Sequence, residues 1–429
     1  MSAAVQSLAA LFSAGADARE GESSWLRKQR EEAMERFVAL GLPTTRLEAW
    51  KHTKLRKFSP RTLVAPSGDA SGWSAEQLAV FGDLGGPRLV FVDGAYRAEL
   101  STAGDTAIVR PLSGASADDA LIADHLGKAF GDEENAFASA NTALFTDGVL
   151  VTIPRGKVVE EPIEVVFATS VGGRDEARFT RNLIVVGKGA QATLVERHVG
   201  RESSDFGVSS TEIFLHDGAV FKHLRVQEEA TESVHIVQTR LKLGRDANYR
   251  GLLANLGGEL VRSETRAIFE GENGTMELDG FYVPRGREHV DTWTVADHAS
   301  AHCFSRQLFK GVLSDKSRGV FNGLVIVRKD AQKTDAIQRN PNILLSDRAT
   351  VDTRPQLEIY ADDVKCTHGA TIGRLDDDAL FYLRARGIAL DAAREMLTTA
   401  FAGEVVDTIE IASVKEHVAQ ALAKKLQGA

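Results

Sequence analysis

The chain has 429 residues, of which 43% are hydrophobic and 26% are charged, and its formal net charge is −9. This composition is typical of a globular protein with a sizeable core, while the negative charge disfavours a general nucleic-acid binder, which needs basic surface to neutralise phosphates. Its two cysteines, Cys303 and Cys366, exclude a secreted disulfide framework and indicate a reducing compartment.

The N-terminus does not resemble a secretory signal peptide. Residues 3–12 are mildly apolar, but no basic residue precedes them, and Asp17, Arg19 and Glu20 follow at once. Nowhere does the sequence approach the roughly 18 consecutive apolar residues of a membrane-spanning helix. We therefore expect a cytoplasmic protein that does not enter a membrane.

Residues 1–143 are predicted to form an N-terminal helical domain with a linker and short strands. A helix is expected over 25–40, capped by Ser23 or Ser24 and ended by Gly41, which suits a left-handed C-terminal cap. Its apolar stripe lies at helical spacing and consists of Leu26, Ala33, Phe37 and Leu40.

Three further elements are expected before residue 144. Residues 60–73 are rich in Pro, Ser and Gly, which indicates a connector. Gly86 and Pro87 introduce a short apolar strand over 88–93, and a helix is expected over 118–130.

Residues 144–370 are predicted to form a β-helix core. Short β-type runs cover 182–186, 193–199, 212–215, 220–226 and 235–243, and glycine-rich or Asp-containing turns separate them. The turn positions Gly189, Gly218, Asp246 and Gly274 are 29, 28 and 28 residues apart, and regular strand–turn units of this kind indicate a repeat architecture. A large antiparallel sandwich is the alternative, but it should show longer strands, whereas a solenoid grows by adding coils.

Residues 371–429 are predicted to form a C-terminal helical domain. The segment 376–386 begins with acids and ends with arginines, which matches both ends of a helix dipole, and Gly387 caps it. A second helix starts at Asp391 and ends near Gly403. In the last helix an apolar stripe recurs every four residues and either packs on its own domain or docks a partner helix: Val414, Val418, Leu422 and Leu426.

Cys366 and His368 form the sharpest local feature. They follow a predicted strand over 356–364, and residues i and i+2 of a strand share a face. A thiolate and an imidazole are suitable ligands for iron or zinc, or partners in a nucleophile–base pair. The alternative is a buried structural cysteine beside a hydrogen-bonded histidine.

Two other groupings are more simply explained by structure. His298, His302 and Cys303 lie close in sequence, but on a β-strand residues i and i+4 stand too far apart for one metal ion. A divalent-ion site is conceivable, although a charged turn is the simpler explanation, at Asp352, Glu358, Asp362 and Asp363.

The sequence contains no motif of a nucleotide-binding loop. It lacks Gly-x-x-x-x-Gly-Lys-Ser/Thr, and it lacks a dinucleotide fingerprint or a nucleophile elbow placed between a strand and a helix. Any use of ATP must therefore come from a partner.

The C-terminal third resembles the SufB/SufD family of iron–sulfur cluster assembly proteins. The resemblance lies in NPNILLS at 340–346, DTRPQLEI at 352–359, ADDVKCTHGAT at 361–371 and LFYLRARGI at 380–388. LEAWKHTKL at 47–55 looks like the family's short Trp-Lys-x-Thr motif. The VKCTHGAT run is similar to the SufD branch, with Thr367 where Ser is common, and the cysteine-rich N-terminal motif of SufB is absent.

The resemblance implies a mainly β fold with a right-handed parallel β-helix core between helical terminal domains. It implies a scaffold subunit, not an enzyme, that pairs with a SufB-like subunit and binds a SufC-like ATPase of the ABC type through C-terminal helices including Phe381, Tyr382 and Arg384. Cys366 and His368 would lie at the SufB interface, where a transient cluster forms. It implies no cofactor stably bound by the chain alone, and no nucleic-acid or membrane partner.

Other functions remain open on the sequence. A SufB-like scaffold is one, and a homodimeric scaffold formed by the isolated chain is another. A β-helix enzyme acting on carbohydrate is another, although four Trp and five Tyr give few of the aromatic residues that sugar clefts favour. A zinc hydrolase using Cys366 and His368 lacks evident further ligands.

Overall fold

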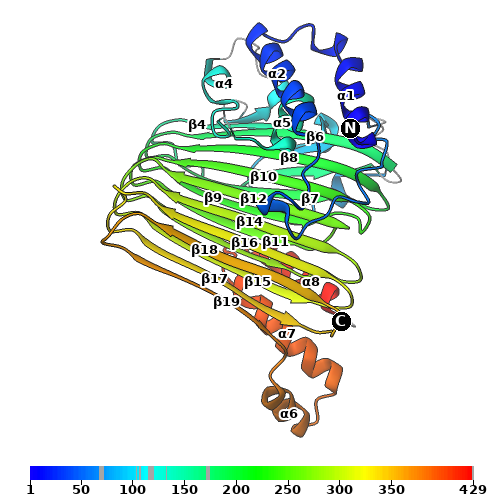
Figure 1. Cartoon of the computed structure of the whole chain (residues 1–429), viewed down its shortest axis with the longest axis vertical. Helices are drawn as coiled ribbons and strands as arrows, with labels where there is room; N and C mark the ends of the chain where they lie inside the picture. Colours follow the sequence, from blue (N-terminus) through cyan, green and yellow to red (C-terminus); the bar gives the residue numbers. More distant parts are fainter. Residues whose placement is uncertain are drawn as a thin grey trace.

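The computed structural model describes residues 1–66, 72–102, 104, 105, 108–114, 120–131, 133–170 and 174–427. The fold is mainly β, with helices near both ends of the chain (Figure 1). The helices are α1 (Ala3–Ala14), α2 (Ser24–Leu40), α3 (Ala75–Leu78), α4 (Ala120–His125), α5 (Ala136–Leu144), α6 (Asp377–Ala385), α7 (Leu390–Val406) and α8 (Ala412–Leu426). The strands are β1 (Arg88–Val92), β2 (Ala95–Tyr96), β3 (Val109–Pro111), β4 (Val149–Ile153), β5 (Ile163–Ala168), β6 (Arg174–Val186), β7 (Gln191–Val199), β8 (Ser204–Leu215), β9 (Val220–Glu228), β10 (Val234–Leu243), β11 (Asn248–Asn255), β12 (Leu260–Phe269), β13 (Thr275–Tyr282), β14 (His289–His298), β15 (Phe304–Leu313), β16 (Arg318–Val327), β17 (Asp335–Leu344), β18 (Thr350–Ile359) and β19 (Lys365–Gly373).

From β4 onward, successive strands alternate between two sheets. Within the described residues, the odd-numbered strands from β19 back to β5, with β1 and β2, form a ten-stranded sheet. The even-numbered strands from β18 back to β4, with β3, form a nine-stranded sheet. Pairing between neighbours is parallel from β5 to β19. Each coil of chain therefore adds one strand to each sheet, which confirms the predicted β-solenoid.

The turn spacing predicted from sequence has a structural cause. Gly189, Gly218 and Asp246 have positive φ angles of 66°, 68° and 57°, and each N–H donates to a carbonyl oxygen of the next coil at 2.7–2.9 Å. The fourth position is Asn273, with φ 59°, and not Gly274 as predicted. Asn tolerates the left-handed region, so the turn residue with positive φ is Asn273. The position predicted from the neighbouring glycine is therefore one residue too late.

The space between the two sheets holds the main core. Alternate strand residues point inward, so apolar side chains from both sheets meet there, including Phe221, Tyr249 and Phe269. Burying a side chain of this size stabilises the fold by about 1.5–3 kcal/mol. The inward face thus fixes the register of the coils, because a slip of one residue would expose it.

The N-terminal helices cover the outer face of the first strands of the nine-stranded sheet. Helix α2 confirms the helix predicted over 25–40, and Gly41 with φ 63° ends it. Phe37 of α2 and Phe137 of α5 pack in one cluster with Phe206 of β8. Part of the connector expected over 60–73, at 67–71, and residues 118 and 119 of the expected helix lie outside the described residues; that helix, α4, ends at His125 and not at 130.

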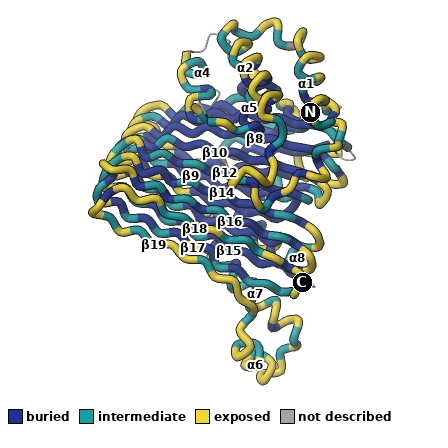
Figure 2. Tube along the Cα trace, viewed as in Figure 1, coloured by how far each residue is buried: buried dark blue, intermediate teal, exposed yellow. Residues whose placement is uncertain are grey.

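The C-terminal helices divide into two parts. The four apolar residues predicted as a stripe on the last helix, from Val414 to Leu426, are all buried in α8 against the outer face of the ten-stranded sheet, near Val226 and Phe281. The stripe therefore packs on its own fold. Helix α6 projects away from the solenoid, and all of its residues are exposed or half-buried (Figures 1 and 2). Among the described residues, no helix has the length and apolar character needed to cross a bilayer.

Candidate functional site

Strands β18 and β19 end the two sheets on the side away from the N-terminal helices (Figure 1). β18 is hydrogen-bonded to β16, and β19 to β17. Every residue of these two strands is exposed or half-buried, whereas nearly all of β10 is buried, a contrast that is visible in Figure 2. The solenoid therefore has one open end, formed by two adjacent edge strands.

Cys366 and His368 lie on β19 at this open end. In the register with β17, Cys366 is beside Ala336 and His368 is beside Gln338, and both β17 residues are fully buried. The side chain of Gln338 reaches the opposite sheet, where it approaches Gly323 of β16. Since neighbours in register share a face, Cys366 and His368 face the mouth of the space between the sheets.

The two side chains differ in accessibility. Cys366 is half-buried and packs against the inner core, and this burial raises the pKa of its thiol. A metal ion or a basic partner group is therefore needed to form its thiolate near neutral pH. His368 is exposed, so its imidazole can reach a ligand or a partner chain. One Cys and one His supply two ligands, whereas an iron–sulfur cluster is held by about four.

The second cysteine–histidine grouping is not brought together. His298 is buried, stacks on Phe269 with ring centroids 4.3 Å apart, and lies 2.8 Å from the Ser305 hydroxyl through Nε2. His302 occupies a turn with φ 60°, and Cys303 belongs to the inner core, where burial raises the pKa of its thiol to about 11. These residues have structural roles, as predicted.

The four acids of the C-terminal region do not come together as a metal-binding group among the described residues. Asp352 pairs with Arg318, and its Oδ1 lies 3.1 Å from Nδ1 of His52 in the N-terminal segment. Asp363 pairs with Lys333 across two turns. Within the described residues, the groups close enough to hold a metal ion do not include these acids. A charged surface is the better description.

Helix α6 presents the residues predicted to bind a partner. Phe381 is 75% exposed and Tyr382 is 56% exposed, which is unusual for large apolar side chains on a helix of an isolated chain. Arg384 is exposed, and the guanidinium carbon of Arg386 lies 4.3 Å from the Tyr382 ring centroid.

Sequence reasoning missed a polar network inside the solenoid. His198, Glu229 and His235 are buried and bring one ligand atom each to within 4.8 Å of the others. A signal exists in the sequence: polar residues replace apolar ones at every second position from His223 to Glu229, on the face that carries the core in other coils. The meeting of β9 with His198 and His235 depends on the coil register, which the sequence does not show directly.

The comparisons with known proteins agree with the fold. Residues 167–401 match the family model described as SUF system FeS cluster assembly, SufBD core domain, and residues 2–62 and 87–165 match the SufBD protein N-terminal region. The chain is 33% identical over 412 residues to the iron–sulfur cluster assembly protein SufD of Escherichia coli, covering 95% of each chain. It is 32% identical over 412 residues to an iron–sulfur cluster assembly SufBD family protein of Synechocystis, covering 93% of this chain and 91% of the relative.

A third relative, an iron–sulfur cluster assembly SufBD family protein of Mycobacterium leprae, is 31% identical over 292 residues, covering 66% of this chain and 73% of the relative. The matched regions span the solenoid and the helices at both of its ends. The chain therefore belongs to the SufBD family of iron–sulfur cluster assembly proteins and is of the SufD type.

Proposed function

We propose that this chain is a scaffold subunit of a Suf-type iron–sulfur cluster assembly complex in the cytoplasm, and not an enzyme in its own right. It pairs with a SufB-like subunit through β18 and β19 and holds a SufC-like ATPase on α6. Iron and sulfide are the cargo of the complex.

The observation that carries this proposal is the open end of the solenoid. An edge strand presents a row of N–H and C=O groups that can pair with another chain. Here two edge strands lie next to each other, one from each sheet. β18 has ten residues and β19 has nine. A partner with a matching solenoid end would pair one strand with β18 and another with β19, and so extend both sheets at once by strand addition.

Apolar side chains at this end support the same surface. Ile359 on β18 and Ile372 on β19 are 41% and 52% exposed, and Tyr360 beside Ile359 is 62% exposed. A rim of apolar residues around edge strands is an aggregation hazard unless a partner covers it. Two copies of this chain meeting end to end would cover the same surface, which accounts for a homodimer when the SufB-like subunit is lacking.

Cys366 and His368 are placed to act at that junction. Their two ligands are too few for a cluster, so the remaining ligands come from the partner in this proposal. An exposed imidazole donates a lone pair to iron or accepts a proton from a thiol of the partner. The half-buried thiol of Cys366 contributes less, because burial raises its pKa and disfavours the thiolate.

The ATPase assignment rests on two observations. The sequence has no phosphate-binding loop, so hydrolysis of ATP belongs to another chain. Helix α6 leaves Phe381, Tyr382 and Arg384 exposed away from the solenoid, as a partner-binding helix would. The net charge of −9 disfavours a nucleic-acid partner.

The test is co-purification with a SufB-like subunit after both open-end isoleucines are changed to lysine, Ile359→Lys/Ile372→Lys. Both side chains are exposed, so the free chain should fold, but lysines on edge strands block strand addition. We expect pairing to weaken at least tenfold. Val158→Lys, at a residue 49% exposed in the loop between β4 and β5, should pair as the wild type does. Undiminished pairing of the double variant would refute the interface.

A further inference from the structure

A polar network lies inside the solenoid where the chain passes from β7 to β8 and from β9 to β10. It centres on His198 of β7, Glu229 after β9 and His235 of β10, which are 0%, 5% and 0% exposed. One ring nitrogen of each histidine and one carboxylate oxygen lie within 4.8 Å of one another. The network therefore joins the inner faces of both sheets with two imidazoles and a carboxylate.

His198 has one ring nitrogen without a hydrogen-bond partner among the described residues. Its Nε2 lies 2.6 Å from Oε1 of Glu196, and Nε2 of His223 lies 2.8 Å from Oε2 of the same carboxylate. The carboxylate thus keeps the proton of His198 on Nε2, and Nδ1 is a buried acceptor with no hydrogen-bond partner among the described residues.

His235 and Glu229 complete the arrangement. Nε2 of His235 lies 2.9 Å from the Ser209 hydroxyl, and Nδ1 lies 2.7 Å from Oε2 of Glu229. Each histidine therefore has one ring nitrogen held by an oxygen outside the group, a Glu196 oxygen for His198 and the Ser209 hydroxyl for His235. Histidines that bind metal ions usually donate their second N–H in this way, to a carboxylate or another oxygen.

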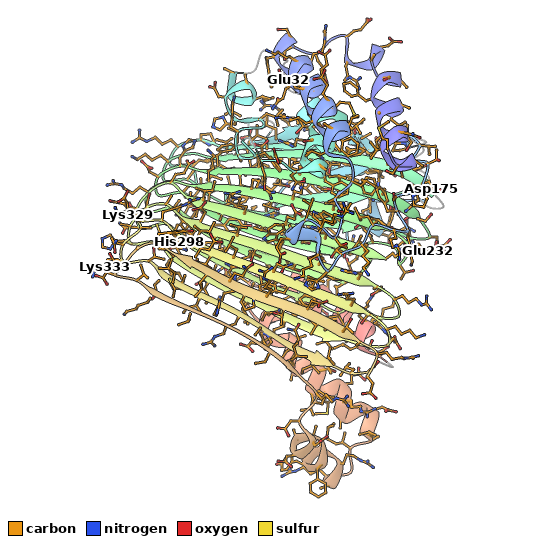
Figure 3. All side chains as sticks on the ribbon, in the orientation of Figure 1. Glu32, Asp175, Glu232, His298, Lys329 and Lys333 are labelled. Carbon is orange, nitrogen blue, oxygen red and sulfur yellow. The ribbon has the colours of Figure 1, made fainter. Side chains whose placement is uncertain are left out.

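A cavity that opens to the surface borders the network at Glu229, and neither His198 nor His235 lines it. It has a volume of about 930 Å³, and Glu229 forms part of its wall. Seven carboxylates and five basic side chains line it, including Asp175 and Glu232, which Figure 3 places together at one end of the strands. An entry with more carboxylates than basic groups attracts cations.

We propose that His198, Glu229 and His235 bind one divalent transition-metal ion within the solenoid. Two imidazoles and a carboxylate are a donor set that zinc and its first-row neighbours accept, with one position left for water. On binding, the ion replaces the contact between His235 Nδ1 and Glu229. The imidazole then binds the ion through the Nδ1 lone pair, with the single proton of neutral His235 on Nε2, facing the Ser209 hydroxyl.

The rival explanation is a closed hydrogen-bond network with a purely structural role. The contacts of Arg178 favour this structural explanation, because its guanidinium pairs with Asp205 and lies 3.1 Å from Oε1 of Glu229. Arg178 contacts Oε1 of Glu229, whereas His235 contacts Oε2. The side-chain amide of Gln227 also donates to Oε2, at 3.0 Å, so a bound ion must displace this contact as well. The two explanations differ in whether the protein takes up a metal ion there.

The test is anaerobic titration of the tag-free, chelator-treated full chain with Co²⁺, followed by visible absorption. The parent carries Cys366→Ala/His368→Ala, so the open end cannot contribute ligands. We expect one Co²⁺ per chain with d–d bands of a low-coordinate site, and a rise in melting temperature with Co²⁺. His198→Gln should lose at least tenfold in affinity, and Glu196→Gln, which removes only the support of His198, about 10–100-fold.

The matched control is His298→Gln, a buried histidine at the other end of the strands (Figure 3), which should bind Co²⁺ as the parent does. If His198→Gln does not fold, Glu229→Gln replaces it, with the same expectation. Absence of saturable Co²⁺ uptake by the parent, or equal uptake by the parent and the ligand variants, would refute the site. Neither result bears on pairing at the open end, because no partner is present.

Discussion

Nε2 of His417 lies 2.9 and 3.0 Å from the two carboxylate oxygens of Glu228, which ties the last helix to β9 across 189 residues of sequence. Burial favours the neutral acid, but the hydrogen bond from His417 and the nearby Arg197 hold the pKa of Glu228 below its ordinary value. Helix α8 is thus part of the flank of the solenoid. Deleting everything after residue 374 would uncover buried core, so α6 must be tested by point substitutions.

The first prediction concerns this tie. His417→Ala should lower the free energy of unfolding by about 1–3 kcal/mol, because it removes a hydrogen bond to a charged, mostly buried carboxylate. Urea denaturation at pH 7.5 measures the change. Gln420→Ala, on the exposed face of α8, should change it by less than about 0.5 kcal/mol. Equal stability of His417→Ala and the wild type would show that the contact between His417 and Glu228 does not stabilise the fold.

The second prediction concerns α6. Phe381→Ala/Tyr382→Ala should weaken binding of the SufC-like ATPase at least tenfold, because it removes two large exposed anchors. Pairing with the SufB-like subunit should persist, and the melting temperature should change little. Leu40→Ala, which truncates an exposed leucine at the other end of the molecule, is the control. Retention of the ATPase by the double variant would place its site elsewhere.

The third prediction concerns pH. Burial lowers the pKa of His298 to about 4, so the folded state keeps this histidine neutral where the unfolded chain takes up a proton. The contribution of this neutral histidine to the free energy of unfolding is complete above pH 6.5 and is lost as the pH falls towards 4. Between pH 7.5 and 5 the loss should be about 2 kcal/mol for this residue. His289, whose pKa burial also lowers to about 4, adds to the same slope.

His298→Phe should reduce that pH-dependent loss by about 2 kcal/mol, since phenylalanine keeps a ring against Phe269 but takes up no proton. Urea midpoints at pH 7.5 and pH 5 give the comparison. Cys303→Ala, a nearby core truncation that carries no charge in this range, should destabilise the protein equally at both pH values. If the free energy of unfolding of His298→Phe fell with pH as steeply as that of the wild type, His298 would not be the source of the pH dependence.

The fourth prediction concerns the thiols. Cys366 is half-buried, whereas Cys303 is 1% exposed and burial raises the pKa of its thiol to about 11. In the native free chain, iodoacetamide should label Cys366 slowly, and faster as the pH rises, while Cys303 stays unlabelled. Both should react in denaturant. Mass spectrometry of peptides locates the label. If Cys303 reacted before Cys366, the turn before β15 would have to open more readily than the open end.

Much of this fold follows from the sequence because its period is simple. The turns recur where Gly189, Gly218 and Asp246 need positive φ, and the stripe from Val414 to Leu426 has one helical face. The pairing of Cys366 with His368 on one face also follows, since it needs only the alternation of a single strand.

What the sequence could not supply depends on which coils meet. The His198 network forms because the turn after β9 brings Glu229 back to β7 and β10, an outcome of three-dimensional register. The contact between His52 and Asp352 joins residues 300 positions apart and has no local signal. The helix α1 was missed because its apolar residues were considered only as a possible export signal.

The measurement that tests the central claim most directly is the iron and sulfide content of the assembled complex carrying His368→Ala. The side chain is exposed, so its loss leaves no cavity, and the complex should assemble and melt as the wild type does. We predict that this complex holds less than about a tenth of the wild-type iron and sulfide, while Cys366→Ala is milder and Thr367→Ala, on the opposite face of β19, is unchanged. Wild-type iron and sulfide in the His368→Ala complex would remove His368 from the cluster site and contradict the account.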